Sequence, residues 1–122
     1  MAPAFFSTDL DRSSKFWCAL GFDERTRSED DGYMILDHPM GIVIHFGLDP
    51  DLVPSENMTN AYLGFTTADE AVALYDAWVG HVLDDGFIHA PEMTSYGMIE
   101  WGLRDPDANA LRVGGPAEPR DR

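Results

Sequence analysis

One pattern of residues occurs twice in this chain, at an offset of 58 residues that carries Thr8 to Thr66. In each copy a short apolar run precedes a cluster of Thr and Asp residues, and a stretch with helically spaced apolar side chains follows. Thr and Asp are favoured just before a helix, because their side-chain oxygens accept from the free N–H groups of its first turn. The repeat therefore predicts two similar modules, each opening with a strand and a helix.

Both stretches predict amphipathic helices with defined ends. The first helix is expected over Leu10–Leu20, because apolar side chains recur on one face there and Gly21 supplies a stop signal. Thr8 or Asp9 is expected to be its N-cap. The second helix is expected over Asp69–Val79 on the same grounds.

Short apolar segments broken by turn-forming residues follow each helix, as is typical of β-strands. The predicted strands are Phe22–Arg27, Tyr33–Leu36 and Gly41–Phe46 in the first module and Phe87–His89, Met98–Arg104 and Ala110–Val113 in the second, after opening runs at Phe5–Phe6 and Tyr62–Phe65. The element order βαβββ, given twice, predicts an α+β fold in which two tandem modules form a curved mixed sheet around a cavity.

The module boundaries follow from composition. Residues 1–48 form module one, a linker with two prolines covers residues 49–59, and residues 60–114 form module two. Residues 115–122 are expected to be a disordered tail. Each module alone is too small to bury much apolar surface, so the modules are expected to pack together or against a second chain.

The charge balance argues against several classes of partner. Twenty-two acidic residues face eight basic ones, which gives a net charge of −14 and a field that repels nucleic acid. No apolar run approaches the roughly 20 residues needed to cross a membrane. Cys18 is the single cysteine and cannot form an internal disulfide. These features favour a cytoplasmic protein with neither a nucleic-acid nor a membrane partner.

Two segments resemble motifs of a known superfamily. Residues 9–22, DLDRSSKFWCALGF, are similar to the first helix of vicinal-oxygen-chelate proteins, which typically reads D-L-x-R-S-x-x-F-Y-x-x-L-G-F. Residues 96–109, YGMIEWGLRDPDAN, resemble their W/Y-G-x-R-E-F-x-x-x-D-P-D-G-N stretch. The resemblance spans residues 2–114 and implies the fold shared by glyoxalase I and the bleomycin-resistance proteins. Ala108 stands where the superfamily usually has Gly, which implies either a slightly different turn or a strain of about 1 kcal/mol if the φ angle there is positive.

The resemblance also implies where a metal would be bound. Metal-dependent members use four strand positions that usually hold His, Glu or Gln, and the matching residues here are Ala2, His45, Asn60 and Arg112. Ala has no donor atom, and Arg would place a permanent cation where the metal would lie. We therefore expect neither a metal ion nor another cofactor.

Without a metal, the ligand site is predicted from aromatic and charged residues around the cavity. In bleomycin-resistance proteins the aromatic residue before the motif's Gly helps to form the drug crevice, and Tyr96 holds that position. Trp101 is alternatively a core residue, because the superfamily has a buried Phe there. The predicted ligand-binding residues are Tyr33, His45, Asn60, Tyr62, Tyr96, Glu100, Trp101 and Arg112.

The resemblance thus implies a metal-free homodimer that sequesters a small aromatic or cationic compound, such as an antibiotic. Stacking side chains and an acidic field suit such ligands. If Arg112 and Arg104 both lie near the cavity, they favour an anionic or carbonyl-bearing ligand instead.

Two other functions stay open. A lyase, isomerase or dioxygenase-type enzyme of the same fold would act on a small carbonyl or thiol compound, with His45 or Glu100 as general base. A regulatory module would have its cavity filled by aromatic side chains. The sequence favours the binding protein over the enzyme, since turnover in this fold usually relies on a metal ion.

Overall fold

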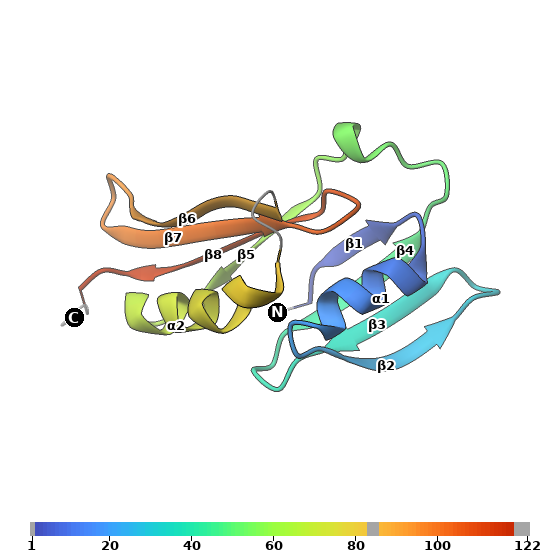
Figure 1. Cartoon of the computed structure of the whole chain (residues 1–122), viewed down its shortest axis with the longest axis horizontal. Helices are drawn as coiled ribbons and strands as arrows, with labels where there is room; N and C mark the ends of the chain where they lie inside the picture. The colour runs from blue at the N-terminus through green and yellow to red at the C-terminus, as the bar shows by residue number, and fades with distance from the viewer. Residues whose placement is uncertain (1, 83–85, 119–122) are drawn as a thin grey trace. The chain divides into compact units, whose positions relative to one another are not determined.

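The computed structural model describes residues 2–82 and 86–118 and has α+β architecture (Figure 1). Two βαβββ repeats follow one another along the chain, and their strands form two four-stranded sheets. By internal contacts the chain divides into two compact units, of which the first comprises Met1–Asn60 with Asp105–Asn109 and the second Ala61–Arg104 with Ala110–Arg122. The α+β class and the tandem βαβββ order are confirmed, with the strands divided between two sheets.

The first unit contains one helix and one sheet. Strand β1 is parallel to β4, whereas β3 is antiparallel to both β4 and β2, so the strand order is β1-β4-β3-β2. Its elements are β1 (Ala4–Ser7), α1 (Leu10–Cys18), β2 (Asp23–Ser28), β3 (Tyr33–Asp37), β4 (Val43–Leu48) and the short 3-10 helix η1 (Pro54–Glu56).

Helix α1 begins as predicted and ends earlier. Asp9 is the N-cap, and its side chain accepts from the Arg12 backbone N–H at 3.3 Å. The helix stops at Cys18 rather than at Leu20, because the chain tightens into bonds three residues long before turning at Gly21. Gly21 has a φ of +99°, which a side chain would make costly.

Trp17 is the centre of the first unit's core. Its fully buried ring lies against those of Phe5, Phe22 and Phe46, with centroids between 5.4 and 6.5 Å away. Edge-on and tilted contacts of this kind are favourable beyond the apolar area that they bury. Helix α1 is thereby fixed to one face of the sheet.

The second unit repeats this plan with longer strands. Its elements are β5 (Asn60–Gly64), α2 (Ala68–Trp78), the 3-10 helix η2 (Val79–His81), β6 (Phe87–Met93), β7 (Met98–Arg104) and β8 (Ala110–Pro116), with strand order β5-β8-β7-β6. Strand β7 has its predicted bounds. Strand β8 continues beyond Val113, so residues 115 and 116 of the predicted tail are in a strand, while residues 119–122 lie outside the described residues.

A capping box sets the start of α2. The Thr67 hydroxyl accepts from the Glu70 backbone N–H, and the Glu70 carboxylate accepts from the Thr67 backbone N–H. Neither of the two described α-helices combines the length and apolar character needed to cross a membrane.

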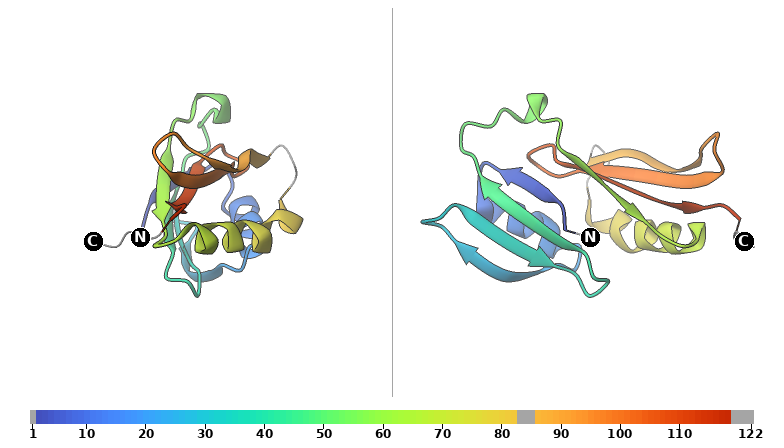
Figure 2. Two further views of the ribbon diagram at one scale, coloured as in Figure 1. Left: turned by 90° about the vertical axis from the view of Figure 1, so that its left-hand side faces the viewer. Right: turned by 180° about the vertical axis from the view of Figure 1, so that it is seen from behind.

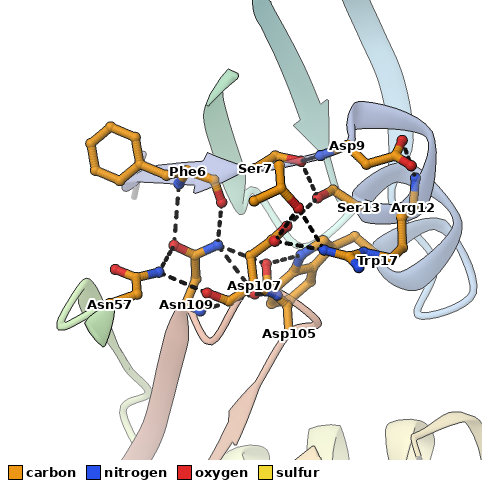
Figure 3. A network of polar contacts seen from close by, with 11 residues as sticks. Phe6, Ser7, Asp9, Arg12, Ser13, Trp17, Asn57, Asp105, Asp107 and Asn109 are labelled. Carbon is orange, nitrogen blue, oxygen red and sulfur yellow. Dashed lines mark hydrogen bonds and ion pairs between the residues drawn. The ribbon is translucent and has the colours of Figure 1, made fainter. Parts of the chain in front are cut away.

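The turn between β7 and β8 packs within the first unit, although both flanking strands belong to the second. Figure 3 shows its polar contacts. Asp105 is buried and accepts from the indole N–H of Trp17 at 3.1 Å and from the backbone N–H of Asn109 at 2.9 Å. Asp107 is fully buried and accepts from Arg12 and from the Thr8 hydroxyl, both at 2.6 Å. Five residues of the second repeat thus complete the first unit's polar core.

Candidate functional site

Each sheet carries its helix on one face only. In the right-hand view of Figure 2 the strands of the first unit stand in front of α1, and β5 of the second unit stands in front of α2. Side chains alternate accordingly: on β4, Ile44 and Phe46 are buried while His45 between them is exposed. The face of each sheet away from its own helix is therefore where exposed side chains gather, and we call it the open face.

Three side chains meet on the open face of the second unit. Tyr62 on β5 donates its hydroxyl to one oxygen of Glu100 on β7, at 2.7 Å. Tyr96, in the turn before β7, donates to the other oxygen at the same distance. One carboxylate therefore fixes two aromatic rings that remain 44% and 63% exposed. We call Tyr62, Glu100 and Tyr96 the tyrosine clamp.

Gly114 makes room for the clamp. It lies directly opposite Glu100 in the β7–β8 ladder, and a Cβ atom placed there would be 2.1 Å from the Tyr62 hydroxyl oxygen. The Tyr62 side chain can therefore cross β8 and reach Glu100 only because residue 114 has no side chain. Sequence reasoning missed this position, although the Gly114–Gly115 pair next to a predicted strand is a signal of close approach.

The clamp changes the acidity of both phenols. The hydrogen bond to Glu100 raises the pKa of Tyr96 above its usual value, because ionisation would set two negative groups together. Burial is the larger cause for Tyr62, whose pKa is raised further, and the hydrogen bond to Glu100 adds to it. Both hydroxyls are consequently protonated donors near neutral pH.

Arg112 lies on the same open face as the clamp. It is exposed and stands opposite Gly102, two residues along β8 from Gly114. Its positive charge offsets part of the rise in the pKa of the Tyr96 hydroxyl. A cation, two aromatic rings and two carboxylates, the clamp's own and that of Glu92 opposite it on β6, thus share one side of a sheet.

Trp101 does not belong to this face. It is fully buried against α2, and its indole N–H donates to the carbonyl of Ala71 at 2.8 Å. Since adjacent strand residues point to opposite faces, Glu100 and Trp101 cannot both line one surface. Of the two roles weighed for Trp101, the structure gives it the core role.

The remaining predicted residues are exposed positions elsewhere. Tyr33 and His45 lie on the open face of the first unit, and Tyr33 is 40% exposed. Asn60 opens β5 and donates to the carbonyl of Met58 at 3.3 Å. Within residues 2–82 and 86–118, no three His, Cys, Asp or Glu side chains gather in a group that could hold a metal ion.

Comparisons with known proteins show which solved structures share this fold. No protein-family model matches the chain, and no curated protein matches its sequence. Solved structures do match. A bleomycin-binding protein complexed with bleomycin is 26% identical, with a TM-score of 0.81 over 94% of this chain and 96% of that one. A bleomycin resistance determinant encoded on the transposon Tn5 is 25% identical, with a TM-score of 0.79 over 95% and 96%. A glyoxalase/bleomycin resistance protein/dioxygenase from Alicyclobacillus acidocaldarius is 19% identical, with a TM-score of 0.78 over 97% and 91%.

Proposed function

The chain belongs to the vicinal-oxygen-chelate superfamily, and on that premise we propose that it is a metal-free protein that sequesters a small aromatic or cationic compound, such as an antibiotic. The similarity to a bleomycin-binding protein and to a bleomycin resistance determinant, over almost the whole of each chain, supports binding over turnover.

The tyrosine clamp is the observation that carries this proposal. Two phenol rings lie on the open face with their hydroxyls fixed on one carboxylate, so little conformational freedom is lost when a flat ligand stacks on them. Exposed aromatic rings held in this way favour planar or cationic compounds. Tyr33 and His45 are proposed as ligand contacts on the open face of the first unit, and Asn60 at the start of β5.

Isothermal titration calorimetry with metal-free bleomycin tests the proposal. Tryptophan fluorescence is a poor reporter here, because Trp17, Trp78 and Trp101 are all buried in the cores. We expect measurable binding that Tyr96→Ala weakens by about tenfold, as the loss of one stacked ring implies. Val53→Ala, which shortens an exposed apolar residue of the first unit, should leave the affinity unchanged. If the unmodified protein, Tyr96→Ala and Val53→Ala all bind bleomycin with equal affinity, the clamp is not part of the binding site.

The homodimer and the absence of a metal are tested on the protein as purified. Native mass spectrometry combined with elemental analysis should show a dimer without a stoichiometric divalent ion. A divalent ion at one per chain would instead support the enzyme alternative, because metal-assisted chemistry would then be possible.

A further inference from the structure

Arg112 is a cation without a carboxylate partner in the part of the chain that the structure describes. The ion pairs there use Arg12, Arg25 and Arg27 and one histidine, and none includes Arg112. In a chain with 22 acidic and only eight basic residues, an unpaired arginine beside a glutamate on the same face calls for an explanation.

The tyrosine clamp supplies that explanation. In the β7–β8 ladder Glu100 is opposite Gly114 and Arg112 is opposite Gly102, so Glu100 and Arg112 are diagonal neighbours on one face. Side chains in this relation are within reach of one another when they are long. Both oxygens of Glu100 are occupied by tyrosine hydroxyls, and the guanidinium has not joined them.

Two glycines border Arg112, and the side chains of Ile88 and Tyr62 lie over them. Gly102 faces it across the ladder, and Gly114 is the next residue of β8 on the same face. A Cβ atom at Gly102 would be 3.5 Å from Cγ of Arg112, so the aliphatic stem of Arg112 passes close to the Gly102 backbone. The stem packs against the sheet, and the guanidinium with its five N–H donors forms no ion pair among the described residues.

We propose that the ligand of this face carries an anionic group, a carboxylate above all, which pairs with Arg112 while an aromatic ring of the same ligand stacks on the tyrosine clamp. The inference rests on the proposed binding function and narrows its ligand to aromatic acids. A planar guanidinium matches a carboxylate in two parallel hydrogen bonds, which gives direction as well as affinity.

The net negative charge of the protein means that a preference for acids can come only from a local positive charge. A chain with a net charge of −14 repels anions at long range, so an aromatic acid gains nothing from the general field. Its affinity must come from a local cation. On this open face Arg112 is the cation diagonal to Glu100, whereas Arg104 lies two residue pairs farther from the clamp along the ladder, opposite Ala110. Removing the charge of Arg112 should therefore abolish the preference for acids.

Three probes that share one ring system test the inference. Naphthalene-2-carboxylate, 2-naphthylmethanol and 2-naphthylmethylammonium differ in charge but present the same surface for stacking. We expect calorimetry on the full chain to show that the carboxylate binds about tenfold more tightly than the other two, as a charge-assisted pair implies. In Arg112→Gln the advantage of the carboxylate should vanish while the affinity of the alcohol is retained. Lys15→Gln removes one exposed cation from α1 and should change none of the three affinities.

The outcomes separate this inference from the proposed function. If the ammonium probe binds as tightly as the carboxylate, or if Arg112→Gln keeps the preference for the acid, the inference is wrong and binding of small molecules stands. If none of the three probes binds while bleomycin does, the inference is again wrong. If neither the probes nor bleomycin binds, both proposals fall together.

Discussion

The side-chain amide of Asn109 pairs with both backbone polar groups of Phe6. It accepts from the Phe6 N–H at 3.1 Å and donates to the Phe6 carbonyl at 2.7 Å (Figure 3). Strand β1 is at the edge of its sheet, so these two groups point away from β4 and would otherwise need another partner. A single side chain thus takes the place of a neighbouring strand and protects an edge that could pair with another chain.

Asn109→Ala should be strongly destabilising. Asn109 is fully buried and also joins Asn57 and Asp105, so its loss leaves several buried polar groups without a partner. We expect the free energy of unfolding in urea to fall by about 2–4 kcal/mol. Asn60→Ala removes an exposed amide with one 3.3 Å bond and should cost about 0.5 kcal/mol or less. Equal losses in the two variants would show that the pairing with Phe6 contributes little.

Ala108→Gly should stabilise the protein. Ala108 has a φ of 67°, the conformation in which an L side chain is strained, and it stands where the superfamily usually has Gly. Relief of that strain outweighs the greater freedom of Gly in the unfolded chain, so we expect a gain of about 0.5–1 kcal/mol in thermal or urea unfolding. Ala73→Gly, at an exposed position of α2, should instead cost about 1 kcal/mol. A loss of stability in Ala108→Gly would contradict the strain argument.

Asp105 should titrate well above an ordinary aspartate. Burial raises the pKa of Asp105 to about 6 from 3.8. The neighbouring negative charge of Asp107, which forms an ion pair with Arg12, acts in the same direction. The folded state then binds this proton more tightly than the unfolded chain does. The contribution of Asp105 to stability therefore rises as the pH falls from about 6 to 3.8, by about 1.4 kcal/mol per unit of pKa difference. Carbon-13 NMR of the side-chain carboxyl should give a midpoint near 6 in the folded protein. The same carbon should titrate near 3.8 in urea, and identical midpoints in both states would refute the shift.

Glu100→Gln should lower the pKa of Tyr96 more than that of Tyr62. The hydrogen bond to Glu100 is the main cause of the raised pKa of Tyr96, whereas burial is the main cause for Tyr62. Loss of the carboxylate charge should thus return the pKa of Tyr96 toward 10 and leave that of Tyr62 still raised. Tyrosinate absorbance near 295 nm, followed against pH with and without Tyr62→Phe and Tyr96→Phe, identifies the two among the four tyrosines of the chain. Glu56→Gln removes an exposed carboxylate of the first unit and should not change the curve.

Gly114→Ala should displace Tyr62 from the clamp. The new methyl group would overlap the Tyr62 hydroxyl and would lie 2.8 Å from Cγ of Glu100. The Tyr62 ring can swing away because its hydroxyl is the free end of a side chain, whereas Glu100 must shift on its strand. We expect a loss of about 1–2 kcal/mol from the broken hydrogen bond and the crowded face. The pKa of Tyr62 should also fall. Gly80→Ala, where a Cβ meets nothing within 4 Å, is the matched control. If Tyr62 titrates unchanged in Gly114→Ala, Gly114 is not required for the clamp.

Much of the fold follows from the sequence because its signals are local. The 58-residue repeat, the capping residues and the alternation of apolar side chains act over one or two turns of chain, and they predicted both helices and the order of the strands. The departure at Ala108 left two outcomes open, a different turn or a strained positive φ, and the structure has the positive φ. The predicted set of ligand-binding residues contains all three members of the clamp.

Other features depend on distances that no local pattern encodes. Alternation along β7 could have separated Glu100 from Trp101, but which of them faces α2 is decided by packing against the helix. The clamp requires the register of three strands, since Tyr62 must cross β8 at the glycine that lies opposite Glu100. The sequence by itself determined the elements and their order. Only the tertiary structure decided that Asn109 closes the edge at Phe6 and that Glu100 holds two tyrosines, because hydrogen bonds between residues 38 to 103 positions apart form only when the chain is folded.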